Sequence, residues 1–132
     1  MAETVLLDTD VVSFILKDNR DFLSPYVPHL INRTLAISFM TVAELFQWAA
    51  VRNWGTRRER QLEEVLKNYL LLPFDIQTCK LWASIRAECQ SKGRRISAQD
   101  AWVAATAIQH DLLLVTNNRD DFDPVSQLRL TH

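Results

Sequence analysis

An acidic residue stands where the first apolar stretch of the chain ends. Asp8 follows the run Val5-Leu6-Leu7, as a residue does where a buried strand leaves a sheet. A carboxylate removed from water is costly, so Asp8 needs a cation, hydrogen-bond donors or a raised pKa. Because ligands of open parallel sheets bind where the strands end, Asp8 marks a candidate site at that edge.

Three further acids stand near the ends of other expected elements. Glu44 opens the helix after the second apolar stretch, and Asp121 lies in the loop that follows the fourth. Both are expected at the same sheet edge as Asp8. Asp100 opens a helix that precedes a strand, so its position depends on how that helix crosses the sheet, which the sequence leaves open.

Each acid also has a purely structural explanation. Glu44 lies three residues after Thr41, and Asp100 lies three residues after Ser97, which is the spacing of a helix capping box. Asp10 is expected to cap the helix that follows the first strand. The acids of the loop after the fourth strand are explained equally well as solvated side chains.

Convergence of these acids favours a metal site. Several carboxylates in one cleft repel each other unless a cation lies among them, and oxygen-only ligands suit Mg²⁺ or Mn²⁺. Such an ion polarises a phosphoryl oxygen and makes its bound water a better nucleophile. The chain has only two glycines, Gly55 and Gly93, which excludes a Gly-rich phosphate loop. The pattern therefore indicates hydrolysis of a phosphodiester.

Composition indicates an ordinary globular chain. Its 132 residues suggest a single domain, and a formal net charge of −1 argues against a basic coat for nucleic acid. No apolar run reaches the roughly 20 residues of a membrane span, so we expect a cytoplasmic protein with no membrane contact. Cys79 and Cys89 lack metal-ligand spacing and are interpreted as reduced thiols on a helix.

Apolar periodicity predicts strands that alternate with helices, and hence a mainly parallel α/β sheet covered on both faces. The expected strands are residues 5–7, 35–38, 70–74 and 112–115, with a short edge strand at 127–130. The expected helices are residues 11–16, an interrupted piece at 22–32, and 42–52, 57–69, 75–92 and 98–110. Gly93 is a suitable residue just past a helix end.

Four stretches, in order along the chain, together resemble the PIN domain, and in particular the VapC-type toxins of bacterial toxin–antitoxin pairs. They are Leu7–Asp10, Thr41–Leu45, Ile96–Ala105 and Val115–Phe122. The resemblance implies a metal-dependent endoribonuclease that uses Mg²⁺ or Mn²⁺ and hydrolyses RNA. It also implies a three-layer α/β/α fold over residues 1–132, with a five-stranded parallel sheet in the order 3-2-1-4-5. Such toxins form homodimers and are inhibited by a cognate antitoxin protein.

The resemblance assigns roles residue by residue. Asp8, Asp100 and Glu44 match the metal ligands, and Asp121 matches a fourth acidic position that varies, with Asn118 standing where some members carry Asp. Beyond the resemblance, we expect Thr9, Thr116 and Asn118 to hydrogen-bond the carboxylates or phosphate. We also expect Arg94 and Arg95, which lie close to Asp100 in the sequence, to contact RNA phosphates.

Two alternatives remain open. Asp8-Thr9-Asp10-Val11-Val12 satisfies the first motif of haloacid-dehalogenase-like phosphatases, although the chain is small for that fold and offers no convincing lysine motif. The other alternative is a catalytically silent PIN-like scaffold that only binds a partner.

Overall fold

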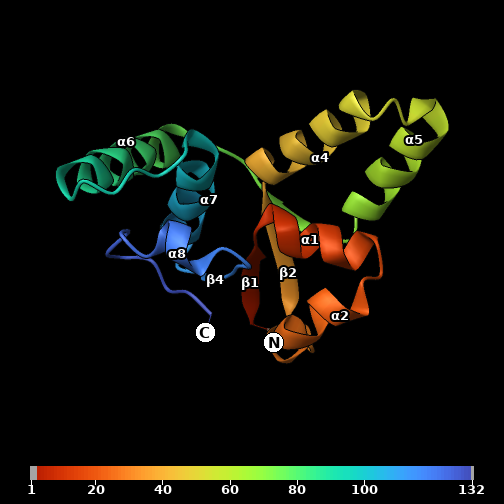
Figure 1. Ribbon diagram of the computed structural model, residues 1–132, viewed down its shortest axis with the longest axis horizontal. Helices are drawn as coiled ribbons and strands as arrows, with labels where there is room; N and C mark the ends of the chain where they lie inside the picture. The colour runs from red at the N-terminus through yellow and green to blue at the C-terminus, as the bar shows by residue number, and fades with distance from the viewer. Residues whose placement is uncertain (1–2, 132) are drawn as a thin grey trace.

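A four-stranded parallel sheet forms the centre of the computed structural model, which describes residues 3–131 (Figure 1). The strands are β1 (Thr4–Leu7), β2 (Thr34–Ser38), β3 (Leu70–Leu72) and β4 (Leu113–Val115), in the order β3-β2-β1-β4. Neighbouring strands pair in parallel throughout. The predicted α/β class, the parallel sheet and the order of its first four strands are confirmed.

The predicted fifth strand is wrong for the residues that the structure describes. Leu130 pairs with Leu114 in a single parallel bridge, in which the Leu114 N–H donates to the Arg129 carbonyl at 2.9 Å. The N–H of Thr116 then donates to the side chain of Thr131 at 3.4 Å, where a longer strand would offer a backbone carbonyl. The ladder therefore stops after one residue, and the order 3-2-1-4-5 is corrected to 3-2-1-4.

Helices cover both faces of the sheet. They are α1 (Thr9–Leu16), α2 (Arg20–Leu23), α3 (Val27–Leu30), α4 (Phe39–Val51), α5 (Gly55–Leu66), α6 (Ile76–Ser91), α7 (Ala98–Gln109) and α8 (Arg119–Phe122), with a 3₁₀ turn η1 (Ser24–Tyr26) between α2 and α3. Within residues 3–131, none of them has the length and apolar content needed to cross a membrane.

Alternation along the strands builds two cores, because successive strand residues face opposite sides. Leu6, Ala36 and Leu114 are fully buried against α6 and α7. Val5 and Ile37 are fully buried on the other side, against α1, α4 and α5. Figure 1 shows these two groups of helices on opposite sides of the sheet. The three layers expected from the sequence are present.

Two helix starts differ from the sequence prediction. The chain passes from β1 into α1 without a loop, so the residue that ends the strand becomes the cap: Asp8, rather than Asp10, accepts a hydrogen bond from the Val11 N–H at 3.0 Å. Similarly, α4 follows β2 directly, and the Ser38 hydroxyl accepts from the Thr41 N–H at 3.2 Å. Both helices therefore begin at the carboxyl edge of the sheet.

The long helix α6 follows its predicted limits closely. Asp75 caps it through the Thr78 N–H at 3.0 Å, and the Thr78 hydroxyl bonds back to the Asp75 N–H at 3.0 Å. Gly93 follows its last turn with φ of 67°, a left-handed conformation that favours glycine. The chain is thereby directed from α6 into the loop that leads to α7.

Candidate active site

Asp8 is buried at the carboxyl end of β1, with 6% of its surface exposed. Its Oδ1 accepts from the Val11 N–H, and its Oδ2 accepts from the Thr116 hydroxyl and from the Asn117 N–H at 3.2 Å. Burial raises the pKa of Asp8 to about 6 even though these donors lower it, and the nearby charge of Asp10 raises it further. The donors therefore offset only part of the cost of burying this carboxylate.

Glu44 lies in the first half of α4, and its Oε1 accepts from the Thr9 hydroxyl at 3.0 Å. Thr9 Oγ1 also lies 3.1 Å from Thr41 Oγ1, so two buried threonines support this half-buried acid. The capping-box explanation of Glu44 is wrong, because α4 starts earlier than predicted and is capped by Ser38. Burial raises the pKa of Glu44, and the charges of Asp100 and Asp10 add to that rise.

Asp100 lies in the first turn of α7, where the Ser97 hydroxyl accepts from its N–H at 3.0 Å. The loop before α7 is held against α6, since Trp82 Nε1 donates to the Ala98 carbonyl and Arg86 Nη1 donates to the Ile96 carbonyl, each at 3.1 Å. This placement brings the start of α7 to the acids. Burial raises the pKa of Asp100, with further contributions from Asp121 and Asp10.

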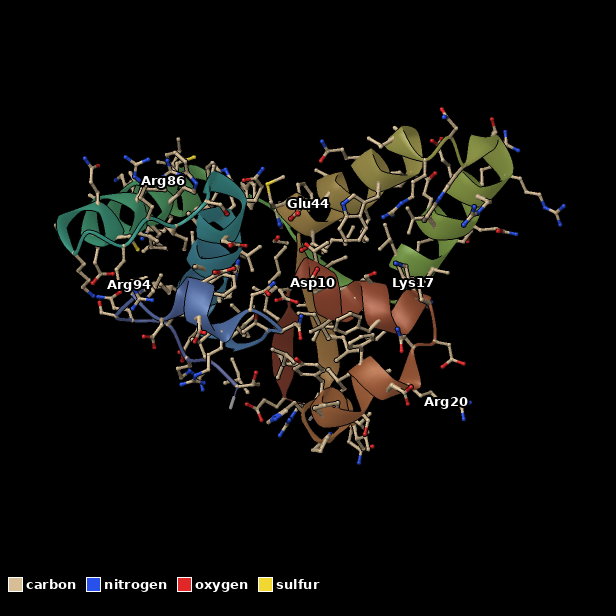
Figure 2. The ribbon with its side chains drawn as sticks, viewed as in Figure 1. Asp10, Lys17, Arg20, Glu44, Arg86 and Arg94 are labelled. Carbon is tan, nitrogen blue, oxygen red and sulfur yellow. The ribbon has the colours of Figure 1, made fainter. Side chains whose placement is uncertain are left out.

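Asp10 joins the group of acids, whereas the sequence suggested a helix cap at the edge of the site. Its charge raises the pKa values of Asp8, Glu44 and Asp100 alike, so it lies within electrostatic reach of all three. Figure 2 shows Asp10 on α1 and Glu44 on α4 near one another at the centre of the molecule. Asp10 Oδ2 accepts from Asn118 Nδ2 at 2.7 Å. The spacing Asp8-Thr9-Asp10 is the sequence signal that points to this second acid of the site.

Asp121 lies on the surface of the short helix α8, where the sequence predicted a loop. Its charge raises the pKa of Asp100, which places it on the α7 side of the group. Asn118 immediately precedes α8, and its N–H donates to Thr116 Oγ1 at 2.9 Å. The chain that leaves β4 thus contributes one acid at the rim and the polar contacts to Asp8 and Asp10.

The donor set fits a hard divalent cation. Among residues 3–131, no three His, Cys, Asp or Glu side chains are close enough together to form a ready metal cluster. Mg²⁺, however, keeps several of its waters and is held directly through only one or two carboxylates. A group of acids spaced too widely for a closed cluster can therefore still bind it. The side chains in question offer only oxygen, and three of them have raised pKa values that a cation would lower (Asp8, Glu44 and Asp100).

Tyr26 reaches this region, although no sequence signal pointed to it. Its hydroxyl donates to Asn117 Oδ1 at 2.8 Å, and the two residues are 91 positions apart in the chain. Burial raises the pKa of Tyr26, and the charges of Asp8 and Asp10 raise it further. The segment that holds η1 therefore borders the acidic site.

Arg94 and Arg95 lie in the loop that precedes α7. Arg94 Nη1 pairs with Asp123 Oδ2 at 3.3 Å, and its Nη2 donates to the Asp120 carbonyl at 3.3 Å, so this side chain spans to α8 and the residue after it. Arg95 lines a separate shallow pocket together with Arg86. Figure 2 shows Arg94 and Arg86 well away from Asp10. Arg94 and Arg95 are both exposed.

Comparison with known proteins gives a consistent result. The family model described as the PIN domain matches residues 5–128. The chain is 32% identical to Toxin FitB of Neisseria gonorrhoeae over 125 residues, which cover 89% of this chain and 90% of that protein. It is also 32% identical to VapC ribonuclease Y4jK of Sinorhizobium fredii over 126 residues, which cover 90% of each.

Solved structures show the same similarity. The structure of VapBC2 from Rickettsia felis bound to a promoter DNA fragment matches with a TM-score of 0.83 and 25% identity over 97% of both chains. FitAcB from Neisseria gonorrhoeae matches with a TM-score of 0.80 and 29% identity over 97% of this chain and 96% of that one. With a family model that covers nearly its whole length and relatives above 30% identity, this chain belongs to the PIN domain family.

Proposed function

We propose that this protein is a metal-dependent endoribonuclease and the toxin of a VapC-type toxin–antitoxin pair. The observation that carries the proposal is the group of acids at one sheet edge, in which Asp8, Glu44 and Asp100 all have pKa values raised by burial and by neighbouring carboxylates. Relatives that are named as VapC ribonucleases and as Toxin FitB support it. Membership of the PIN domain family removes the support for a haloacid-dehalogenase-like phosphatase.

In this proposal Asp8, Glu44 and Asp100 hold Mg²⁺ or Mn²⁺, and Asp121 contributes directly or through water. When bound there, the ion would polarise a phosphoryl oxygen of the RNA and activate a water as the nucleophile. Thr116 and the Asn117 N–H keep the Asp8 carboxylate in one orientation, as Thr9 does for Glu44. Such outer hydrogen bonds fix ligand geometry and commonly change metal affinity or activity by about 10- to 100-fold.

Asp10 adds negative charge to the same site. Its carboxylate is fixed by Asn118, and it raises the pKa of each of the three proposed ligands. This charge increases the attraction of the site for a divalent cation. Arg94 and Arg95, exposed in the loop that precedes α7, are proposed to contact RNA phosphates.

The proposed partners are a cognate antitoxin and a second copy of this chain. VapBC-5 from Mycobacterium tuberculosis, a structural neighbour with a TM-score of 0.70 and 25% identity, is described as a member of the VapBC family of toxin–antitoxin systems, which supports the antitoxin. For the homodimer, support comes from an apolar surface along the edge strand β3 and the start of α6, where Leu70 is 46%, Leu71 40% and Ile76 72% exposed. We place this single nuclease domain in the cytoplasm, where a ribonuclease toxin meets its RNA.

The direct test is cleavage of total RNA by the purified chain with Mg²⁺ or with a chelator. The proposal predicts cleavage with Mg²⁺ that is lost with the chelator and lost in D8N. Cleavage that persists in D8N would contradict it. Absence of any metal-dependent cleavage would instead favour a silent binding scaffold.

A further inference from the structure

We infer that Tyr26 is a positioning residue for the acidic site, which acts through Asn117 on the Asp8 carboxylate. This inference rests on the proposed function, because it concerns the geometry of that site. Tyr26 belongs to η1, far in the sequence from the loop after β4. None of the four PIN-like stretches includes it.

Hydrogen bonds to the short loop after β4 connect Tyr26 with Asp8. The Tyr26 hydroxyl donates to Asn117 Oδ1 at 2.8 Å, and the Asn117 N–H donates to Asp8 Oδ2 at 3.2 Å. The neighbouring Thr116 hydroxyl donates to the same carboxylate oxygen. The side chain of Asn117 is therefore tied to η1 while its backbone supports Asp8.

Tyr26 is itself held firmly. Pro25 has its own backbone angle φ fixed by its ring one residue before Tyr26, and Pro28 lies in the first turn of α3, where proline is well tolerated. The Tyr26 ring stacks on Phe14 with centroids 6.4 Å apart, and Phe14 stacks on Phe22 at 5.4 Å. The Tyr26 ring thus packs against α1, and its hydroxyl reaches the loop after β4.

The hydroxyl contributes to position more than to stability. Asn117 is exposed and Tyr26 is partly buried, so their hydrogen bond competes with water and adds little to the stability of the fold. The same loop also supports Asp10, since Asn118 Nδ2 donates to its carboxylate at 2.7 Å. Loss of the tether would therefore allow the loop to move beneath both acids.

The test compares Y26F with Y69F in the full chain. Each variant removes one hydroxyl and keeps the ring. Tyr69 serves as the control because it packs against the core that includes α5, and burial alone, with no charge of the acidic site, raises its pKa. For RNA cleavage with Mg²⁺, we expect Y26F to lower kcat about tenfold with KM for RNA unchanged, because small displacements of catalytic groups cost this much or more. Y69F should keep the wild-type kcat.

Two further measurements separate positioning from general damage. N117A should reduce kcat as Y26F does, and the double variant should show no additional loss, because both act through one contact. In the metal-free protein, hydrogen exchange at the Asn117 amide should be faster in Y26F than in Y69F, a readout that needs neither metal nor RNA.

The outcomes are distinct. Wild-type kcat in Y26F, additive losses in the double variant, or unchanged exchange at Asn117 would each overturn the role of Tyr26. Wild-type protein that cuts no RNA would overturn the proposed function, while the exchange measurement would still decide whether Tyr26 holds the loop.

Discussion

The Thr9 hydroxyl donates a hydrogen bond to Glu44 Oε1 at 3.0 Å and so joins the helix that follows β1 to the helix that follows β2. Thr9 is 7% exposed, and Glu44 is only half-buried. This hydroxyl therefore holds an acid of the site and links α1 to α4.

Replacement of Thr9 by valine tests this contact. Valine keeps the shape of the side chain but removes the donor, so T9V should lower the free energy of unfolding by about 1–2 kcal/mol in urea denaturation. T9S keeps the hydroxyl and serves as the control. Equal stability of T9V and the wild-type protein would show that Glu44 does not depend on Thr9.

The raised pKa of Asp8 predicts how metal-free stability changes with pH. Its folded-state pKa of about 6 exceeds the ordinary value of 3.8, so the folded protein binds this proton more readily than the unfolded chain. Stability should therefore rise as pH falls through about 6 towards 4, by at most about 3 kcal/mol from this group. It should be lowest above pH 6.

D8N provides the comparison, because its side chain cannot ionise. Thermal unfolding between pH 5 and 8 in a chelator should show a weaker pH dependence for D8N and a higher Tm than the wild-type protein at pH 8. If the Tm of D8N fell more steeply with rising pH than that of the wild-type protein, a group other than Asp8 would carry the pH dependence.

Salt dependence tests the two arginines before α7. If Arg94 and Arg95 contact phosphates, each replacement by alanine should reduce the slope of log K against log salt by about 0.7 for single-stranded RNA. R57A on α5 is the matched control and should leave the slope unchanged. Because Arg94 pairs with Asp123, D123N should be measured beside R94A. An unchanged slope in R95A would remove that residue from the RNA surface.

The apolar edge of the sheet predicts a dimer. Ile76 at the start of α6 is 72% exposed, and Val51 at the end of α4 is equally exposed. I76E should shift the protein from dimer to monomer in light scattering, because a buried unpaired charge opposes association. V51E should leave the dimer intact. A monomeric wild-type protein, or a dimer that survives in I76E, would argue against this interface.

Sequence patterns predicted the central features because these depend on local signals. The apolar run before Asp8 predicted β1, Gly93 marked the end of α6, and the spacing of the acids pointed to one edge of the sheet. The position of Asp100, left open by the sequence, depends on contacts from α6 to the loop before α7.

Other features depend on contacts between distant residues and could not be predicted. Asp10 was assigned as a helix cap because the absence of a loop after β1 is not visible in the sequence. Tyr26 and Asn117 are 91 positions apart in the chain, and only the tertiary fold brings them together. The fifth strand was wrong because a short apolar run does not show how many residues will pair, and Leu130 makes only one bridge.

The initial rate of RNA cleavage against Mg²⁺ concentration, measured for the wild-type protein and for D100N, tests the central claim most directly. In D100N the amide keeps the size of the side chain and the Ser97 cap can still form, so the Tm should stay close to that of the wild-type protein. The account predicts Mg²⁺-dependent cleavage by the wild-type protein and a rate lower by about 100-fold or more in D100N. Cleavage by D100N at the wild-type rate, with the same dependence on Mg²⁺, would contradict it.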